Sequence, residues 1–438
     1  MRRTVLGVLW LGVYLFIVLA PVALMLLPPV PTGRSFWVEL SVALGFVGLT
    51  QIGIQFILIG RFKPLTYPYG MDVVLKYHRQ IAVVATLFVL VHPALILIEH
   101  PARLALLNPF GGTWASKAGL LAVVLLLALI ITSVWRERLR LSYETWRVLH
   151  TLMGVLILVF SQLHVSLAGL YVNTVWKQLL WIASSTVLVG LVVYLRLLKP
   201  YLQKRRPWRV VGVRDEGGGT VNVDLEAVGH DGFRFHPGQF AWLKVGDSPF
   251  TVEEHPYSIA SSAERTDRLS FGIKALGDFS ERMQRLEAGT TVYIDGPHGA
   301  FSIDRDQAPG YVFIAGGVGI TPMMSFLTTM ADRGDPRPVL LIYSTNTEPE
   351  LAYSDEIEAL RGRLDLETVF VCEEPPHDWA AEEGKVTADL LERQMPKERF
   401  VRHFFICGPG PMMKDTRAIL REHGVPPSHI HHEEFNLA

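Results

Sequence analysis

Four histidines in the apolar half of the chain form two pairs with the same spacing. His78 and His92 are fourteen residues apart, and so are His150 and His164. Fourteen residues rise about 21 Å along an α-helix and make about 3.9 turns, so both histidines of a pair face one side at different depths. If the two segments are parallel helices, His78 meets His150 and His92 meets His164. Two facing imidazoles can hold one haem iron axially, so the spacing predicts two haems stacked across a membrane.

A purely structural role for these histidines is the alternative. A histidine inside a bilayer can simply hydrogen-bond a neighbouring helix. An ionisable residue at such a depth is nevertheless a functional-site hypothesis by default. The same spacing on two separate segments favours metal binding.

The elements that must position these histidines are apolar stretches near the 20 residues that a bilayer crossing needs. Six stretches qualify, at roughly 5–27, 37–60, 79–99, 118–135, 148–168 and 175–197. Backbone polar groups in lipid must be satisfied internally, so each stretch is expected to be a helix. The alternative for the first stretch is a signal peptide, because Arg2 and Arg3 precede it, but its apolar run exceeds the usual 7–15 residues or so.

The orientation follows from the positive charges in the loops. The opposite side carries only Arg34, Arg103, Lys117 and Lys177. The other basic residues near the stretches lie at the N-terminus and after the second, fourth and sixth stretches: Arg2, Arg3, Arg61, Lys63, Lys76, Arg79, Arg136, Arg138, Arg140, Arg147, Arg196, Lys199, Lys204, Arg205 and Arg206. This distribution predicts a multi-pass protein of the cell membrane with both termini in the cytoplasm.

The composition changes at the basic, proline-containing segment 199–207, after which the chain reads as a soluble α/β protein. Charged residues make up 19% of the whole chain, below the roughly 25% of soluble domains. The net charge of −1 does not point to nucleic acid as a partner. Cys372 and Cys407 are too few for a disulfide framework, which predicts a reducing compartment for this half.

Short alternating segments between about residues 208 and 301 predict a small antiparallel β-barrel. Tyr257 can stack on an aromatic ring system, and the Ser258 hydroxyl can hydrogen-bond a ring nitrogen. Gly277 and Ser280, at a predicted helix start, can hold a pyrophosphate. Each motif alone could be an ordinary turn, but their order favours a flavin site. The predicted flavin contacts are His255, Pro256, Tyr257, Ser258, Ile273, Lys274, Gly277, Asp278, Phe279 and Ser280.

Strands alternate with helices from Tyr311 onward, which predicts a nucleotide-binding α/β domain. Two strands each end in a glycine-containing loop before a helix, where a phosphate can approach the backbone closely. Thr321 suits the N-cap of the first helix and Pro322 its first turn. Cys407 could be a buried structural thiol, but its place at a strand end favours proximity to a nicotinamide. The predicted contacts are Gly316, Gly317, Gly319, Thr321, Pro322, Cys407, Gly408 and Pro409.

With these motifs in this order, the second half resembles the ferredoxin–NADP reductase superfamily, and the whole chain resembles the NADPH oxidase and ferric reductase family. The resemblance implies FAD, two b-type haems and NADPH or NADH as cofactors. It implies that Ser258, Cys407, Glu433 and Phe435 lie at the site of hydride transfer, with Phe435 as the aromatic that shields the flavin. Three residues follow Phe435 here, whereas many members end on that aromatic.

Other departures from the family leave some properties open. Many oxygen-reducing members carry a second histidine one turn after the outer ligand of the third helix, where this chain has Ile96. The chain has no calcium-binding loop, so constitutive activity is expected. Thr345 and Asn346 follow the second strand of the nucleotide domain with no arginine beside them for a 2′-phosphate, so NADH and NADPH both remain possible.

The sequence thus predicts a six-helix bis-haem transmembrane domain over 1–200, a FAD-binding antiparallel β-barrel domain over 207–305 and an NAD(P)H-binding α/β domain over 309–438. Electrons would pass from cytoplasmic NAD(P)H to an external acceptor. Molecular oxygen is the first candidate, ferric or cupric chelates are the second, and a quinone or partner protein is an alternative of another class. His100 is interpreted as interfacial, or else as a residue near the acceptor. The lipid bilayer is an expected partner, and no obligatory protein partner is evident.

Overall fold

The computed structural model describes residues 2–305 and 307–433. The chain falls into two compact units. The first comprises Met1–Pro68 and Val73–Lys199, and the second comprises Tyr69–Asp72 and Pro200–Ala438. The division between Lys199 and Pro200 lies at the change of composition.

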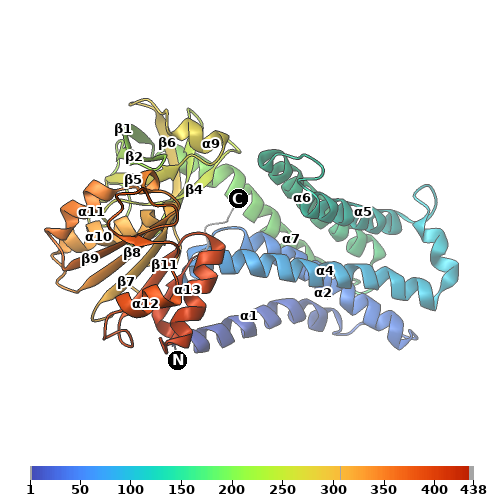
Figure 1. Ribbon diagram of the computed structural model, residues 1–438. Helices are drawn as coiled ribbons and strands as arrows, with labels where there is room; N and C mark the ends of the chain where they lie inside the picture. The colour runs from blue at the N-terminus through green and yellow to red at the C-terminus, as the bar shows by residue number, and fades with distance from the viewer. Residues whose placement is uncertain (1, 306, 434–438) are drawn as a thin grey trace. The chain divides into compact units, whose positions relative to one another are not determined.

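Within the described residues, six helices of the first unit are long and apolar enough to cross a membrane, and they lie side by side in Figure 1. They are α1 (Arg2–Met25), α2 (Phe36–Leu58), α4 (Met71–Glu99), α5 (Trp114–Val134), α6 (Tyr143–Ala168) and α7 (Val175–Val193). The helix α3 (Lys63–Tyr69) and the 3₁₀ turn Pro101–Leu107 lie in connections, and α7 continues through the π-helical turn Tyr194–Leu198 into α8 (Lys199–Lys204). The predicted six-helix bundle is confirmed.

Two helices begin earlier than their apolar stretches. The helix α4 begins at Met71 rather than 79, and α6 at Tyr143 rather than 148. The reason is that the first turns contain polar residues, which fall outside an apolar stretch but are still helical. In α6, Ser142 Oγ caps the helix by accepting from the Thr145 amide. His78 and His150 therefore lie inside their helices, not at the starts.

One end of the bundle is held by a buried lysine at the start of α7. The ammonium of Lys177 is fully buried and donates to the carbonyls of Met25, Leu27 and Pro29 at 2.9, 2.6 and 3.1 Å. An ammonium has three donors, and all three are used here. The last carbonyls of a helix lack intrahelical partners and carry its negative dipole end. Lys177 therefore caps α1 and ties it to α7.

We expect Lys177→Met to destabilise the bundle by about 1–3 kcal/mol, because the three carbonyls lose their donor inside the protein. The measurement is thermal unfolding of the purified protein in detergent. Lys117→Met is the control, because Lys117 lies over the Trp114 ring at 4.9 Å, a contact worth about 0.5–1 kcal/mol when exposed. Equal melting temperatures for the two variants would refute this role of Lys177.

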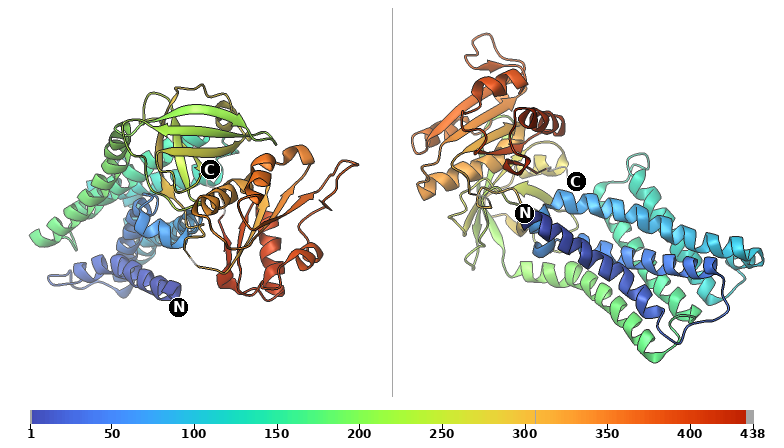
Figure 2. Two further views of the ribbon diagram at one scale, coloured as in Figure 1. Left: turned by 90° about the vertical axis from the view of Figure 1, so that its left-hand side faces the viewer. Right: turned by 90° about the horizontal axis from the view of Figure 1, so that it is seen from below.

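The second unit begins with a six-stranded antiparallel sheet, green to yellow in Figure 2. Its strands are β1 (Trp208–Asp215), β2 (Thr220–Ala227), β3 (Phe240–Val245), β4 (His255–Ser258), β5 (Arg268–Lys274) and β6 (Thr291–His298), in the order β4-β3-β6-β1-β2-β5. The edges β4 and β5 meet through a single bridge, Ile259 to Phe271. The predicted barrel is therefore not fully closed. The helix α9 (Asp278–Met283) follows β5.

A parallel sheet follows, in the order β10-β9-β8-β7-β11-β12. Its strands are β7 (Tyr311–Gly316), β8 (Val339–Thr345), β9 (Leu366–Cys372), β10 (Glu382–Glu383), β11 (His403–Cys407) and β12 (Ile430–His432). The helices α10 (Ile320–Arg333) and α11 (Ser354–Arg361) pack on one face, while α12 (Ala388–Gln394) and α13 (Gly410–Glu422) pack on the other. The chain first builds outward from β7 to β10 and then returns to β11. The order in which strands are added thus reverses between β7 and β11, although the strands themselves stay parallel. Such sheets bind ligands at this point.

Candidate redox sites

The structure brings the four histidines of α4 and α6 together in the predicted pairs. The ring centres of His78 and His150 are 6.3 Å apart, and those of His92 and His164 are 6.2 Å apart. A metal held between two imidazoles at about 2.0–2.1 Å from each separates the ligand nitrogens by about 4 Å. With each ring centre about 1 Å further back, the centres would lie about 6 Å apart, so each pair has the spacing that two histidine ligands of one haem iron would need.

Three of the four rings have a partner on Nδ1. His92 Nδ1 lies 2.8 Å from the Ser41 carbonyl oxygen, and His164 Nδ1 lies 2.8 Å from the Ala115 carbonyl oxygen. A carbonyl only accepts, so Nδ1 carries the proton in both rings. This tautomer leaves the Nε2 lone pair for a metal, and a partner of this kind orients a ligating histidine. The chemistry of the donor set therefore fits haem ligation.

Two glycines let the neighbouring helices approach the rings of the second pair. A Cβ at Gly45 of α2 would lie 3.1 Å from His92 Nδ1, and one at Gly119 of α5 would lie 2.8 Å from His164 Nδ1. At the other end of the bundle, Arg196 Nη2 donates to Thr151 Oγ1 at 2.7 Å. The pair His78 and His150 therefore lies at the end where the chain leaves the bundle.

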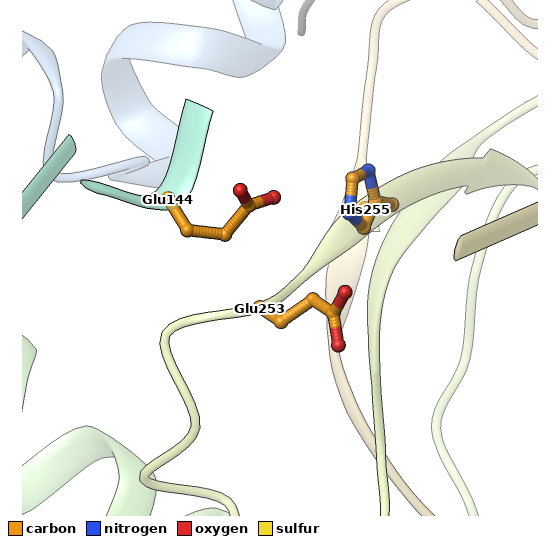
Figure 3. Close-up of side chains that lie close together, drawn as sticks. All are labelled: Glu144, Glu253 and His255. Atoms are coloured by element: carbon orange, nitrogen blue, oxygen red, sulfur yellow. The ribbon is translucent and has the colours of Figure 1, made fainter. Parts of the chain in front are cut away.

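The flavin motif of the sequence comes together around α9. The rings of Tyr257 and Phe279 are nearly parallel, with their centres 6.3 Å apart, and the His255 ring lies 4.2 Å from Phe279. Figure 3 shows His255 and Glu253 on the segment that enters β4, and Glu253 pairs with Arg282 of α9. Burial raises the pKa of the Tyr257 hydroxyl, so the ring stays neutral. A neutral aromatic surface of this kind can stack on a flavin.

Some predicted flavin contacts are engaged within the protein. Ser280 Oγ accepts from the amides of Leu276 and Gly277 at 2.8 and 2.9 Å, so these groups cap α9. The Ile273 side chain is fully buried in the core of the antiparallel sheet. Lys274 Nζ pairs with Glu350 at 2.9 Å. The motif residues 255–258 and 277–280 are thus neighbours, but a pyrophosphate at Gly277 and Ser280 would have to share the amides that the cap uses.

The two glycine-containing loops meet at the carboxyl ends of β7 and β11. A Cβ at Gly319 would lie only 2.3 Å from the Cys407 carbonyl oxygen, and one at Gly316 would lie 2.6 Å from the Met412 sulfur. Glycine is therefore required for this close approach. The predicted N-cap at Thr321 is wrong, because α10 begins at Ile320 after a 3₁₀ turn, and Gly319 is the cap. Thr321 and Pro322 lie in the first turn.

Two buried groups lie beside these loops, Cys407 and Glu433. Burial, together with the Glu433 carboxylate, raises the pKa of the Cys407 thiol, so this side chain is a neutral thiol. Burial, together with the carboxylate of Asp72, raises the pKa of Glu433 to about 8. The Ala300 amide donates to Glu433 Oε1 at 3.4 Å. Phe435, the predicted flavin shield, lies outside the described residues.

The raised pKa of Glu433 predicts a pH dependence of stability. The folded protein holds this proton up to about pH 8, whereas an unfolded glutamate loses it near its ordinary value of 4.5. The contribution to stability is therefore complete below about pH 4.5 and is lost as the pH rises through 8. We expect Glu433→Gln to flatten the decline in melting temperature between about pH 5 and 9. Glu422→Gln, at an exposed position, should follow the unmodified protein, and a Glu433→Gln curve that also follows it would contradict the assignment.

Comparison with known protein families adds a separate line of support. Three family models match the chain in order: a ferric reductase like transmembrane component over residues 44–161, an FAD-binding domain over 216–302 and an oxidoreductase NAD-binding domain over 313–418. This chain belongs to the ferric reductase and NADPH oxidase family. It is therefore a membrane oxidoreductase whose ferric-reductase-like domain is joined to FAD- and NAD-binding domains.

Similar proteins cover the second half of the chain. The reductase component of propane 2-monooxygenase from Rhodococcus jostii is 31% identical over 224 residues, which are 49% of this chain and 59% of that protein. Ferredoxin–NADP reductase B from Sorangium cellulosum is 30% identical over 52% of this chain and 96% of its own length. Among solved structures, the FAD/NAD-binding domain of nitric oxide dioxygenase from Vibrio cholerae is 21% identical, with a TM-score of 0.47 over 52% of this chain and 97% of that one.

Proposed function

We propose that this member of the family moves electrons from NAD(P)H through FAD and two haems to an acceptor on the far side of the membrane, and that this acceptor is molecular oxygen. The observation that carries the proposal is the matched spacing of the two histidine pairs, 6.3 and 6.2 Å. When bound, FAD takes a hydride from NAD(P)H and releases single electrons, and haem iron carries one electron at a time.

In this proposal His78 and His150 hold the haem at the end where the chain leaves the bundle, and His92 and His164 hold the outer one. The residues 255–258 and 277–280 bind FAD, and the loops at residues 316–319 and 407–409 bind the dinucleotide. The domains extend over 1–200, 207–305 and 309–438, with both termini in the cytoplasm. Glu433 and Cys407, both uncharged at neutral pH, keep the site of hydride transfer free of fixed negative charge.

An apolar cluster on the helices that support the second pair favours a small neutral acceptor. Val165, next to His164, and Val42, next to Ser41, pack against a cluster formed by Met25, Phe46, Tyr171, Val172 and Trp181. A bulky, charged metal chelate cannot enter packed apolar side chains without displacing them. Oxygen is small, uncharged and soluble in lipid. Ferric or cupric chelates remain the second candidate.

A protein acceptor is the alternative of a different class. Several similar proteins are reductase components of oxygenases, but their similarity is confined to about half of this chain. If the protein donates electrons to a quinone or a partner protein, the purified enzyme should oxidise NAD(P)H slowly with either oxygen or a metal chelate as acceptor.

The deciding experiment follows NAD(P)H oxidation by the purified full chain with one acceptor at a time. We expect oxygen consumption with superoxide or peroxide as product. Ferric chelate reduction in air should be suppressed by superoxide dismutase, and it should be slow without oxygen. Rapid chelate reduction under anaerobic conditions would assign the second candidate, and inactivity with both acceptors would favour a quinone or protein.

A further inference from the structure

The two histidine pairs differ in what holds their Nδ1 atoms. Both rings of the second pair, His92 and His164, face main-chain carbonyls at 2.8 Å, and Ser41 Oγ, which donates to the His92 carbonyl, also lies 3.0 Å from His92 Nδ1. In the first pair, His150 Nδ1 lies 3.1 Å from the hydroxyl of Ser133. His78 Nδ1 is buried and has no hydrogen-bond partner among the described residues. One pair therefore has two strong acceptors, and the other has one weaker acceptor for two rings.

The hydrogen bonds of Ser133 can be assigned without ambiguity. Ser133 Oγ lies 2.7 Å from the Leu129 carbonyl, which can only accept, so the single hydroxyl proton is donated there. The contact from Trp146 Nε1 at 3.3 Å must then be accepted by the serine oxygen, because indole N–H only donates. The same holds for His150 Nδ1. Ser133 thus fixes the proton of His150 on Nδ1 and leaves Nε2 free to face His78.

A hydrogen bond from Nδ1–H makes an imidazole a more basic ligand. A more basic ligand stabilises the ferric state over the ferrous state, so it lowers the reduction potential of the iron. A carbonyl at 2.8 Å does this more effectively than a hydroxyl at 3.1 Å that already accepts another donor. The ring of His78 lacks the effect.

We propose that the site at His92 and His164 has the lower reduction potential of the two, and that Ser133 is the positioning residue of the site at His78 and His150. This inference rests on the proposed haem ligation. Each site changes between ferric and ferrous iron by one electron, and no other bond is made or broken. Electron transfer from the first site to the second is therefore energetically unfavourable by itself. The subsequent transfer to the acceptor must be favourable enough to drive it.

The first test is a redox titration of the haem absorption bands in the full chain. His150→Ala retains only the second site and His164→Ala only the first, so the two variants assign the two components. We expect the component that survives in His150→Ala to have the lower potential. An equal or higher potential for that component would overturn the inference. Absence of haem from the unmodified chain would instead overturn the proposed function.

The second test distinguishes the effect of the Ser133 hydroxyl from that of the neighbouring Thr132 hydroxyl. We expect Ser133→Ala to raise the potential of the first component and to change the EPR g values of that low-spin ferric site, while the second component stays in place. Ser133→Thr, which keeps the hydroxyl, should restore both. The control is Thr132→Ala, because among the described residues Thr132 Oγ1 bonds only within its own helix, to the Ala128 and Leu129 carbonyls at 2.8 and 3.0 Å.

Selective loss of the first haem in Ser133→Ala, with normal content in Thr132→Ala, would also support the positioning role. An unchanged first component in fully loaded Ser133→Ala would refute it. A shift of equal size in Thr132→Ala would refute it as well, because the effect would then belong to the helix and not to the hydroxyl.

Discussion

Replacing His92 or His164 by alanine is expected to remove about half of the bound haem and to stop reduction of the acceptor, while NAD(P)H still reduces the flavin. The ring centres of His92 and His164 are 6.2 Å apart, so one imidazole alone cannot supply both ligands of an iron between them. Without this haem, electrons have no carrier to the acceptor. Loss of a supporting residue alone costs a metal site about 10–100-fold, so loss of a ligand should cost acceptor reduction more than about 100-fold. Haem quantitation and rapid-mixing measurement of flavin reduction test the two halves of this expectation.

His100→Ala is the matched control, because His100 is an exposed histidine just beyond α4. It should keep both haems. Slower acceptor reduction with full haem content would place His100 near the acceptor, which is the alternative interpretation of this residue. Normal haem content in His92→Ala and His164→Ala would show that the assigned ligands are wrong.

The second large effect is expected where the two glycine-containing loops at the ends of β7 and β11 meet. In Gly319→Ala the new methyl group would lie 2.3 Å from the Cys407 carbonyl oxygen and 2.9 Å from the Gly408 amide nitrogen. Backbone atoms cannot rotate away, so the two loops must separate at a cost of about 1–3 kcal/mol. We expect flavin reduction by NADPH and NADH to fall by about tenfold or more in kcat/KM, since 1.36 kcal/mol is a factor of ten.

Gly410→Ala serves as the control, because a Cβ at Gly410 meets nothing within 4 Å. Gly410 begins α13, directly after the loop that Gly319 contacts, and its replacement should leave nucleotide kinetics unchanged. Retained FAD in Gly319→Ala would show that the antiparallel sheet is intact. Unchanged kcat/KM in a folded Gly319→Ala protein would contradict the placement of the dinucleotide between these loops.

The order of the elements was predictable from local patterns. Apolar length alone located the six membrane helices, because lipid demands long uninterrupted stretches. It missed the first turns of α4 and α6, which contain polar residues and therefore fall outside the apolar stretches. The alternation of the strands predicted the antiparallel barrel but not its degree of closure, because it does not report whether the edges β4 and β5 pair along their length or meet at one bridge.

The candidate site was predictable only where residue type and spacing carry the chemistry. The four histidines stand out because they repeat at fourteen residues in apolar surroundings. Ser133 and Trp146 give no such signal, because a serine or tryptophan in a membrane helix is common and its partner depends on how α5 and α6 pack. Thr321 was misplaced because the 3₁₀ turn Gly317–Gly319 has no distinct sequence pattern.

The support of His92 and His164 by main-chain oxygens has a consequence for how this protein can vary. The carbonyls of Ser41 and Ala115 remain in place whatever side chain stands at those positions, so point substitutions there leave these main-chain hydrogen bonds intact and remove at most the contact of Ser41 Oγ with His92 Nδ1 at 3.0 Å. The hydroxyl beside His150 belongs to a side chain and is lost or regained by a single substitution at Ser133. Descendants of this sequence could therefore adjust the site at His78 and His150 in single steps, whereas the main-chain hydrogen bonds at His92 and His164 would change only through a shift of whole helices.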